Sequence, residues 1–261
     1  MGKPADLKYE RKGHVLILAL NRSAKSNAIS KGLLADLSEA LARAANDEQV
    51  RVVVLRAEGK HFSVGADVDE IKGFMSVADY EDFFRCFHET LNRLENLPKP
   101  TIAAINGLAL GGGCELCLAA DIRIAAENAS FALPEIKLGT LPGAGGTQRL
   151  PRIVGASKAL EMIYTGDSIS VQEAYRIGLV NKVVPPEKLK GEAIGLARRL
   201  EKGPPIALRT AKLLIRQGSN LERGAALELA IKSVSQLAAT DDQQEGFRAF
   251  LEKRDPKFVG R

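Results

Sequence analysis

Two patterns of apolar and polar residues alternate along the first two-thirds of the chain. Short runs rich in β-branched residues predict buried strands, and apolar residues spaced three to four positions apart predict helices. The predicted strands cover residues 14–20, 50–55, 101–105 and 121–125, with a further strand-like run at 179–184. Helices are predicted after an N-cap at Ser30 (apolar Leu33, Leu34, Leu37 and Leu41), over 80–97 and over 112–120. This alternation with short connections favours an α/β core.

The last third of the chain has an almost wholly helical pattern. The predicted helices cover residues 156–165, 171–177, 186–200, 205–217, 221–239 and 242–253. A Lys-Gly-Pro-Pro break at 202–205 is the clearest marker of a change in organisation. We therefore expect an α/β core over residues 1–195 and a helical C-terminal region over residues 196–261.

Composition and charge narrow the class of protein. The chain has 261 residues, of which 45% are hydrophobic and 26% charged, as in ordinary globular proteins. No apolar run approaches the roughly 20 residues that span a bilayer, and the N-terminus lacks an apolar signal core, so a cytoplasmic location without membrane contact is expected. The net charge of +5 permits a polyanionic small-molecule ligand. Nucleic-acid binding is not expected, because the basic residues are scattered.

The cysteines do not indicate a redox or metal site. Cys114 and Cys117 form a C-x-x-C within an apolar helical pattern, and neither a second C-x-x-C nor an H-x-x-H accompanies it. We interpret the pair as small apolar fillers of a buried helix and predict no metal.

Two glutamates in glycine- and proline-rich surroundings stand out as candidate catalytic residues. Glu115 lies in ALGGGCEL (109–116), and Glu135 lies in LPEIKLG (133–139), which PGAGG (142–146) follows. Burying an acid in such apolar segments is costly. Two of them indicate paired carboxylates facing one site, as acid/base work on a single water requires. The alternatives are a helix-dipole role for Glu115 and an ion pair of Glu135 with Lys137 or Arg149.

The glycine triplet 111–113 lies between a predicted strand and a predicted helix. Glycines there let the backbone approach a ligand and direct N–H groups at it, as in an oxyanion hole. The alternative is close packing of helix against strand. A second donor would come from the loop 63–67, where Ala66 is small enough for its N–H to approach a ligand. Phosphate-loop, zinc-protease and serine-hydrolase motifs are absent from the sequence.

These segments together resemble the crotonase (enoyl-CoA hydratase/isomerase) superfamily, and specifically enoyl-CoA hydratase. The similarity runs over nearly the whole chain and is densest over residues 100–152. The motifs that carry it are Asn21-Arg22 with Asn27-Ala28, FSVGAD (62–67), Asn106-Gly107 with GGGCEL (111–116), Pro134-Glu135 with PGAGGTQRL (142–150), and KRDPKFVGR (253–261).

The resemblance implies a fold and an assembly. The fold is α/β, a crotonase (ClpP-like) right-handed spiral of ββα units with a helical C-terminal region that drives trimerisation. The partners implied are an acyl-CoA thioester and further copies of the chain, in a homotrimer or a homohexamer that is a dimer of trimers. No cofactor is implied, because coenzyme A is part of the substrate.

The resemblance also assigns roles to single residues. Glu115 and Glu135 would be catalytic, and the N–H groups of Ala66 and Gly112 would form the oxyanion hole. Gly143 would help to position the substrate. Contacts to CoA would come from Lys25, Ser26, Ala66, Asp67, Val68, Gly112 and Lys257, the last often across a subunit boundary. The usual lysine of the first loop stands one place later here, at Lys25.

The implied reaction is the reversible addition of water to a trans-2-enoyl-CoA, giving a 3-hydroxyacyl-CoA. A rival crotonase-fold reaction, enoyl-CoA isomerisation, typically keeps one acid, whereas this chain has both. A rival from another class is an RNA-binding homologue, which would predict a lysine-rich helical face.

Overall fold

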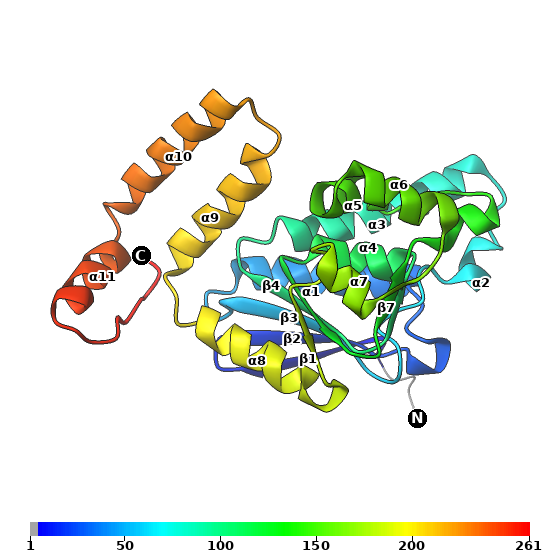
Figure 1. Cartoon of the computed structure of the whole chain (residues 1–261). Coiled ribbons are helices and arrows are strands. Elements are labelled where there is room, and N and C mark those ends of the chain that lie inside the picture. The colour runs from blue at the N-terminus through cyan, green and yellow to red at the C-terminus, as the bar shows by residue number, and fades with distance from the viewer. Residues whose placement is uncertain (1–4) are drawn as a thin grey trace.

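The computed structural model describes residues 5–261. Its larger sheet has the strand order β1-β2-β3-β4-β6-β9, of which Figure 1 labels β1 to β4. Neighbouring strands run parallel throughout, except for the antiparallel pair β1 and β2. The strands are β1 (Leu7–Lys12), β2 (Val15–Leu20), β3 (Val52–Ala57), β4 (Thr101–Ile105), β6 (Ile122–Ala126) and β9 (Lys182–Val184).

Short strands form a second, smaller sheet, and they alternate along the chain with strands of the larger sheet. It has the order β5-β7-β8, with β5 (Leu108–Leu110), β7 (Ser130–Ala132) and β8 (Ile169–Ser170). The chain passes from β4 to β5 and then into helix α4 (Gly112–Ala119), and it later passes from β6 to β7. Each passage places one strand in each sheet, which is the arrangement that a spiral of ββα units requires.

Helices cover both faces of the larger sheet. On one face, α8 (Leu189–Leu200) packs against β2, β3, β4 and β6 through apolar side chains such as Val52, Ile102 and Ala193. On the other face, α1 (Lys31–Asn46), α3 (Val77–Glu95) and α4 contribute to the main core. Because both faces are covered, the central strands have no polar side to present to water.

Three helices, here called the C-terminal arm, project away from this body (Figure 1). They are α9 (Pro205–Gly218), α10 (Arg223–Leu237) and α11 (Asp241–Leu251). The remaining helices are α2 (Val68–Ile71), α5 (Gly146–Val154), α6 (Ala156–Thr165) and α7 (Val171–Arg176). The predicted division after residue 195 falls within α8 and stays a prediction. No helix over residues 5–261 is long and apolar enough to cross a bilayer.

Most predicted elements form, including the N-cap at Ser30, whose side chain accepts from the Leu33 N–H. Helix α3 starts at Val77, earlier than predicted, because Ser76 and Asp79 form a capping box. The sequence-based prediction lacks β1, β5, β7, β8, α2 and α5.

Candidate active site

Glu115 occupies the first turn of α4, directly after the end of β5. The chain turns at Gly111, whose positive φ of 50° suits glycine. Glu115 is 2% exposed. Its Oε1 accepts hydrogen bonds from the N–H groups of Ala144 (2.8 Å) and Gly146 (2.7 Å). A purely dipole-stabilising role does not account for this buried position or for two donors from a separate loop.

Burial raises the pKa of Glu115 to about 7. The Gly146 N–H opposes this rise, the charge of Glu135 adds to it, and the Ala144 N–H and the Arg149 guanidinium oppose it as well. Glu115 therefore changes protonation near neutral pH, where a general base or acid works best.

Glu135 lies on a 3₁₀ helix (Pro134–Leu138) that follows β7. Its Oε2 is buried and has no hydrogen-bond partner within residues 5–261, and burial raises the pKa of this carboxyl. Lys137 pairs instead with Asp167 (2.7 Å) and Arg149 with Glu95 (2.7 Å), so the structural alternative for Glu135 is wrong. An unpartnered carboxyl in a buried position is typical of a site that receives a ligand.

Glycines let both carboxyl groups lie close to the backbone at a helix start, Gly111 before α4 and Gly146 at the first position of α5. A Cβ added to Gly111 would lie 2.9 Å from Oε1 of Glu135, and one added to Gly146 would lie 3.0 Å from Oε1 of Glu115. A side chain at either position would displace a carboxylate. The structure thus brings the two predicted acids to one place from two separate segments.

The two predicted oxyanion-hole amides, Ala66 and Gly112, are also neighbours. The loop that carries Ala66 joins β5 through the Leu110 N–H, which donates to the Ser63 carbonyl (3.0 Å). A Cβ added to Gly112 would lie 3.4 Å from the Ala66 nitrogen. Within the described residues, neither amide donates to a protein acceptor. Two free N–H groups side by side, one of them at a helix N-terminus, suit an oxygen that gains negative charge.

Several predicted CoA contacts cluster around α2. The Lys25 ammonium lies 3.0 Å from the Asp69 carboxylate and 3.5 Å from that of Asp67. Asp67 is buried, caps α2 and pairs with Arg22 (2.9 Å), so its carboxylate is already engaged within the protein. Val68 is half exposed at the start of α2.

The remaining predicted CoA contacts lie in different parts of the molecule. Ser26 adjoins the Ala66 loop, because its carbonyl accepts from the Val64 N–H (3.2 Å). Gly143 lies on the loop that holds Glu115, against the Phe84 ring. Lys257 follows α11, and its N–H donates to Glu245 of that helix (2.9 Å); α11 lies at the far end of the molecule from α2 (Figure 1). A single chain therefore does not bring Lys257 to this site.

The cysteine pair is confirmed as filler. Cys114 and Cys117 are fully buried on α4, and burial raises the pKa of both thiols. No group of three or more His, Cys, Asp or Glu side chains in the described part of the chain could hold a metal ion.

Arg149 is a residue near the site whose function was not foreseen. It was considered only as a partner of Glu135, but its Nη1 donates to the Ala144 carbonyl (2.9 Å), on the loop that holds Glu115. A lone arginine three residues after a Gly-Ala-Gly-Gly run is a weak signal, because its side-chain partners come from α3, far away in sequence.

Comparisons with known proteins find relatives along nearly the whole chain. The family model described as enoyl-CoA hydratase/isomerase matches residues 10–261. The 2,3-dehydroadipyl-CoA hydratase of Escherichia coli K12 is 42% identical, over 98% of this chain and all of that protein. The crotonyl-CoA hydratase of Syntrophomonas wolfei is 39% identical, over 97% of each. A crystal structure of an enoyl-CoA hydratase from Bacillus anthracis, 41% identical, superposes with a TM-score of 0.95 over 98% of this chain and all of that one.

These findings confirm the predicted crotonase fold and the predicted reaction type, a hydro-lyase acting on enoyl-CoA thioesters. The residue assignments within the site remain proposals. The chain belongs to the enoyl-CoA hydratase/isomerase family.

Proposed function

We propose that this protein adds water across the C2=C3 bond of a trans-2-enoyl-CoA, giving a 3-hydroxyacyl-CoA, with Glu115 and Glu135 as its catalytic residues. The observation that carries the proposal is the convergence of a buried and a partly buried carboxyl group, both with raised pKa values, beside two backbone N–H groups that have no protein acceptor among the described residues. Relatives named as hydratases support the same reaction.

The thioester carbonyl would bind between the N–H groups of Ala66 and Gly112. These donors polarise the carbonyl, draw electron density from the conjugated double bond and make C3 electrophilic. As negative charge develops on the oxygen, the fixed donors stabilise it without having to reorient. Each such donor is typically worth about 3–4 kcal/mol in the transition state.

One water would lie between the two carboxyl groups. Glu115, ionised, takes a proton from the water as the oxygen forms its bond to C3. Glu135, protonated, gives its proton to C2. Glu115 then carries the proton taken from the water and Glu135 is ionised, and transfer of that proton from Glu115 to Glu135 restores the starting state. Since the two groups interact, their pKa values belong to the pair.

The raised pKa values of Glu115 and Glu135 allow the pair to keep a proton near neutral pH. An ordinary glutamic acid would be almost fully ionised at pH 7, and two such groups would offer no proton to C2. Burial of Glu135 favours its protonated form. The two N–H donors on Glu115 favour the ionised form of that residue against its burial.

An isomerase needs only one acid, so retention of two buried carboxyl groups favours hydration over isomerisation. No observation on the described residues favours the RNA-binding alternative.

The substrate class is an acyl-CoA, but the acyl group is open. The relatives carry names with different acyl groups, 2,3-dehydroadipyl and crotonyl. Coenzyme A enters as part of the substrate, and the proposed reaction needs no cofactor. Assembly as a trimer or hexamer would allow Lys257 of one subunit to reach the CoA of another. The cytoplasmic location remains a prediction.

Loss of the conjugated enoyl-thioester absorbance of crotonyl-CoA tests the proposal. The wild-type protein should consume crotonyl-CoA, and Glu115→Gln and Glu135→Gln should each lower kcat by at least about 100-fold. Glu161→Gln, on the exposed surface of α6, is the matched control and should keep full activity. Wild-type protein that leaves crotonyl-CoA and longer enoyl-CoA thioesters unchanged would refute the hydratase assignment.

A further inference from the structure

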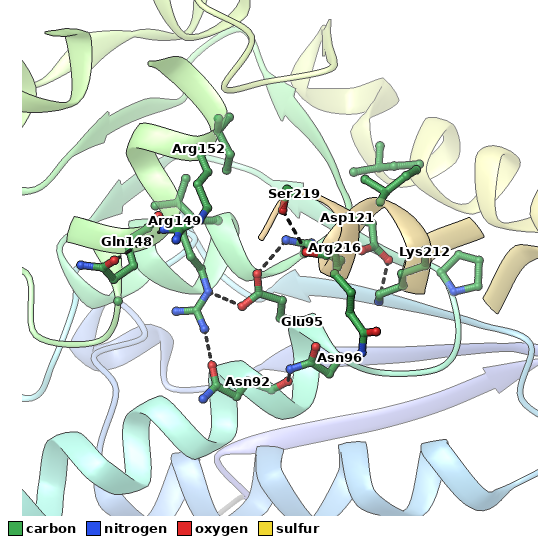
Figure 2. Close-up of a pocket in the computed structure, with 18 of the residues that line it drawn as sticks. Asn92, Glu95, Asn96, Asp121, Gln148, Arg149, Arg152, Lys212, Arg216 and Ser219 are labelled. Atoms are coloured by element: carbon green, nitrogen blue, oxygen red, sulfur yellow. Dashed lines mark hydrogen bonds and ion pairs between the residues drawn. The ribbon is translucent and has the colours of Figure 1, made fainter. Parts of the chain in front are cut away.

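A cleft of about 900 Å³ opens between α3, α5 and α9 (Figure 2). It contains neither Glu115 nor Glu135, but Gly145 and Arg149 of the loop and helix behind Glu115 line it. Charged side chains from both the body and the C-terminal arm meet there, which makes it a junction between the two.

Arg149 is the centre of this junction. Its side chain is 8% exposed, and each of its three nitrogens has a partner. Nε donates to Oε2 of Glu95 (2.7 Å), Nη2 to Oδ1 of Asn92 (2.6 Å) and Nη1 to the carbonyl of Ala144 (2.9 Å). Asn92 and Glu95 lie three residues apart on α3, so one helix face fixes the guanidinium from one side. Figure 2 shows the two α3 side chains directed at Arg149.

Ala144 connects this arginine to the active site. Its carbonyl accepts from Arg149, and its N–H donates to Glu115 (2.8 Å). A Cβ on Gly145 would lie 2.3 Å from Nη1 of Arg149, so only glycine allows the guanidinium to come so close to the loop. The position of the arginine therefore sets the direction of an N–H group that holds the proposed base.

Glu95 extends the network into the C-terminal arm. Its second oxygen, Oε1, accepts from Nη1 of Arg216 on α9 (2.7 Å). Arg216 also contacts Asp121 (3.2 Å), and Lys212 of the same helix contacts Asp121 (2.8 Å). One carboxylate thus joins an arginine of the active-site region to an arginine of the arm.

We propose that Arg149 is a positioning residue for Glu115, and that Arg216 of the C-terminal arm holds Arg149 in place through Glu95. This inference rests on the proposed function of Glu115. Because Glu95 is shared, movement of the arm changes the hold on Arg149, and through Ala144 the placement of the catalytic carboxylate.

The charged groups around Glu115 determine the expected pH effect. Glu135 faces it from the 3₁₀ helix, and Arg149 from α5; His88 on α3 lies beside Arg149, and burial together with the Arg149 charge lowers the His88 pKa. Loss of Arg149 removes a positive charge and loosens an N–H donor, and both changes favour the protonated form of Glu115. The acidic limb of the pH–rate profile should therefore move to higher pH.

The first test compares Arg149→Met and Arg149→Lys with Arg152→Gln in crotonyl-CoA hydration. Arg149→Met should lower kcat by roughly 10- to 100-fold while KM changes little, since misplacement of a reacting group affects the chemical step. The acidic limb of its kcat/KM profile should move to higher pH by about half a unit or more. Arg149→Lys should restore the pH of the acidic limb more fully than it restores kcat, because lysine supplies the positive charge but not the planar set of donors. Arg152 is exposed on the same helix, and within residues 5–261 its side chain forms hydrogen bonds with Gln148 of α5 alone, so Arg152→Gln should match the wild type.

The second test uses the arm and stays informative if Arg149→Met does not fold. Arg216→Gln should lower kcat by about 2- to 10-fold and move the acidic limb in the same direction. Arg209→Gln, on an exposed position of the same helix, should do neither. In the double variant with Arg149→Lys, the Arg216→Gln effect should shrink, because both substitutions act on one network.

The outcomes separate the two proposals. Wild-type protein without hydratase activity would refute the proposed function. Active wild-type protein, with folded Arg149 and Arg216 variants that keep its kcat and acidic limb, would refute the positioning role alone. A loss in Arg216→Gln that simply adds to that of Arg149→Lys would refute the connection through Glu95.

Discussion

At the scale of single residues, Glu115 combines two opposing influences. Burial disfavours its charge, and two backbone N–H groups favour it, with a net pKa of about 7 instead of the usual 4.5. A carboxyl whose pKa is higher in the folded than in the unfolded state binds its proton more tightly when folded. Its contribution to stability is complete below about pH 4.5 and is lost as the pH rises through 7.

Glu115→Gln should therefore be more stable than the wild type in alkaline solution. At pH 8 the shift from 4.5 to about 7 corresponds to at most about 3 kcal/mol of unfolding free energy. The advantage should disappear near pH 4.5, where the wild-type carboxyl is protonated as well. Urea unfolding at the two pH values measures the difference, with Glu161→Gln as control. A variant less stable than the wild type at pH 8 would show that the charged form of Glu115 is not disfavoured in the fold.

Sequence alone singled out both acids as candidates, because an acid among glycines and apolar residues is conspicuous. It did not identify what holds them. The donors to Glu115 follow it by 29 and 31 residues, and the partners of Arg149 precede that residue by 54 and 57. Only the folded chain brings these groups together.

At the scale of elements, the start of α4 shows why the glycine triplet is there. A Cβ on Gly112 would lie 2.8 Å from the Phe87 ring of α3, and one on Gly113 would lie 2.4 Å from the Ser63 carbonyl. The packing alternative for these glycines is thus correct for Gly113. For Gly112, close packing and the proposed oxyanion hole require the same absence of a side chain.

Gly112→Ala should consequently damage activity more than it damages the fold. The new methyl group would move the start of α4 away from Phe87 by some tenths of an ångström, and the Gly112 N–H with it. We expect kcat to fall by about 10- to 100-fold and stability to fall by about 1–3 kcal/mol. Gly195→Ala is the control, because Gly195 is exposed on α8 with no atom near its Cβ position. That substitution should leave kcat unchanged and stabilise the helix by up to about 1 kcal/mol. Equal kcat values for the two variants would contradict the role of Gly112.

The elements that sequence did not predict have physical reasons in common. Strands β5, β7 and β8 have only two or three residues each, too few to display an alternating pattern. Strand β1 is exposed at every position after Leu7, so it lacks the apolar face that marks a strand. Helix α5 contains Pro151, which reads as a helix breaker. The longer buried strands and every helix of ten or more residues were predicted.

At the scale of the molecule, the C-terminal arm has apolar surface that a single chain leaves exposed. It leaves a stripe of apolar side chains on α10 exposed: Leu227, Ile231 and Val234 are each more than half accessible. They follow the i, i+4, i+7 spacing of one helix face. Apolar faces of this kind mark contacts between proteins. Lys257 lies at the end of the same arm, so a contact between two subunits through this arm would allow Lys257 of one subunit to reach the CoA bound to the other.

Ile231→Glu should therefore reduce the assembly to the single 28.1-kDa chain, because the interface would have to bury an unpaired charge. Gln236→Glu introduces the same change of charge on the opposite face of α10 and should keep the wild-type mass. Light scattering coupled to size-exclusion chromatography distinguishes three, six and one copies. If the arm also supplies Lys257 across the interface, KM for the enoyl-CoA should rise in Ile231→Glu and in Lys257→Ala alike. A monomeric wild type, or an Ile231→Glu protein with wild-type mass, would show that this face of α10 is not the interface.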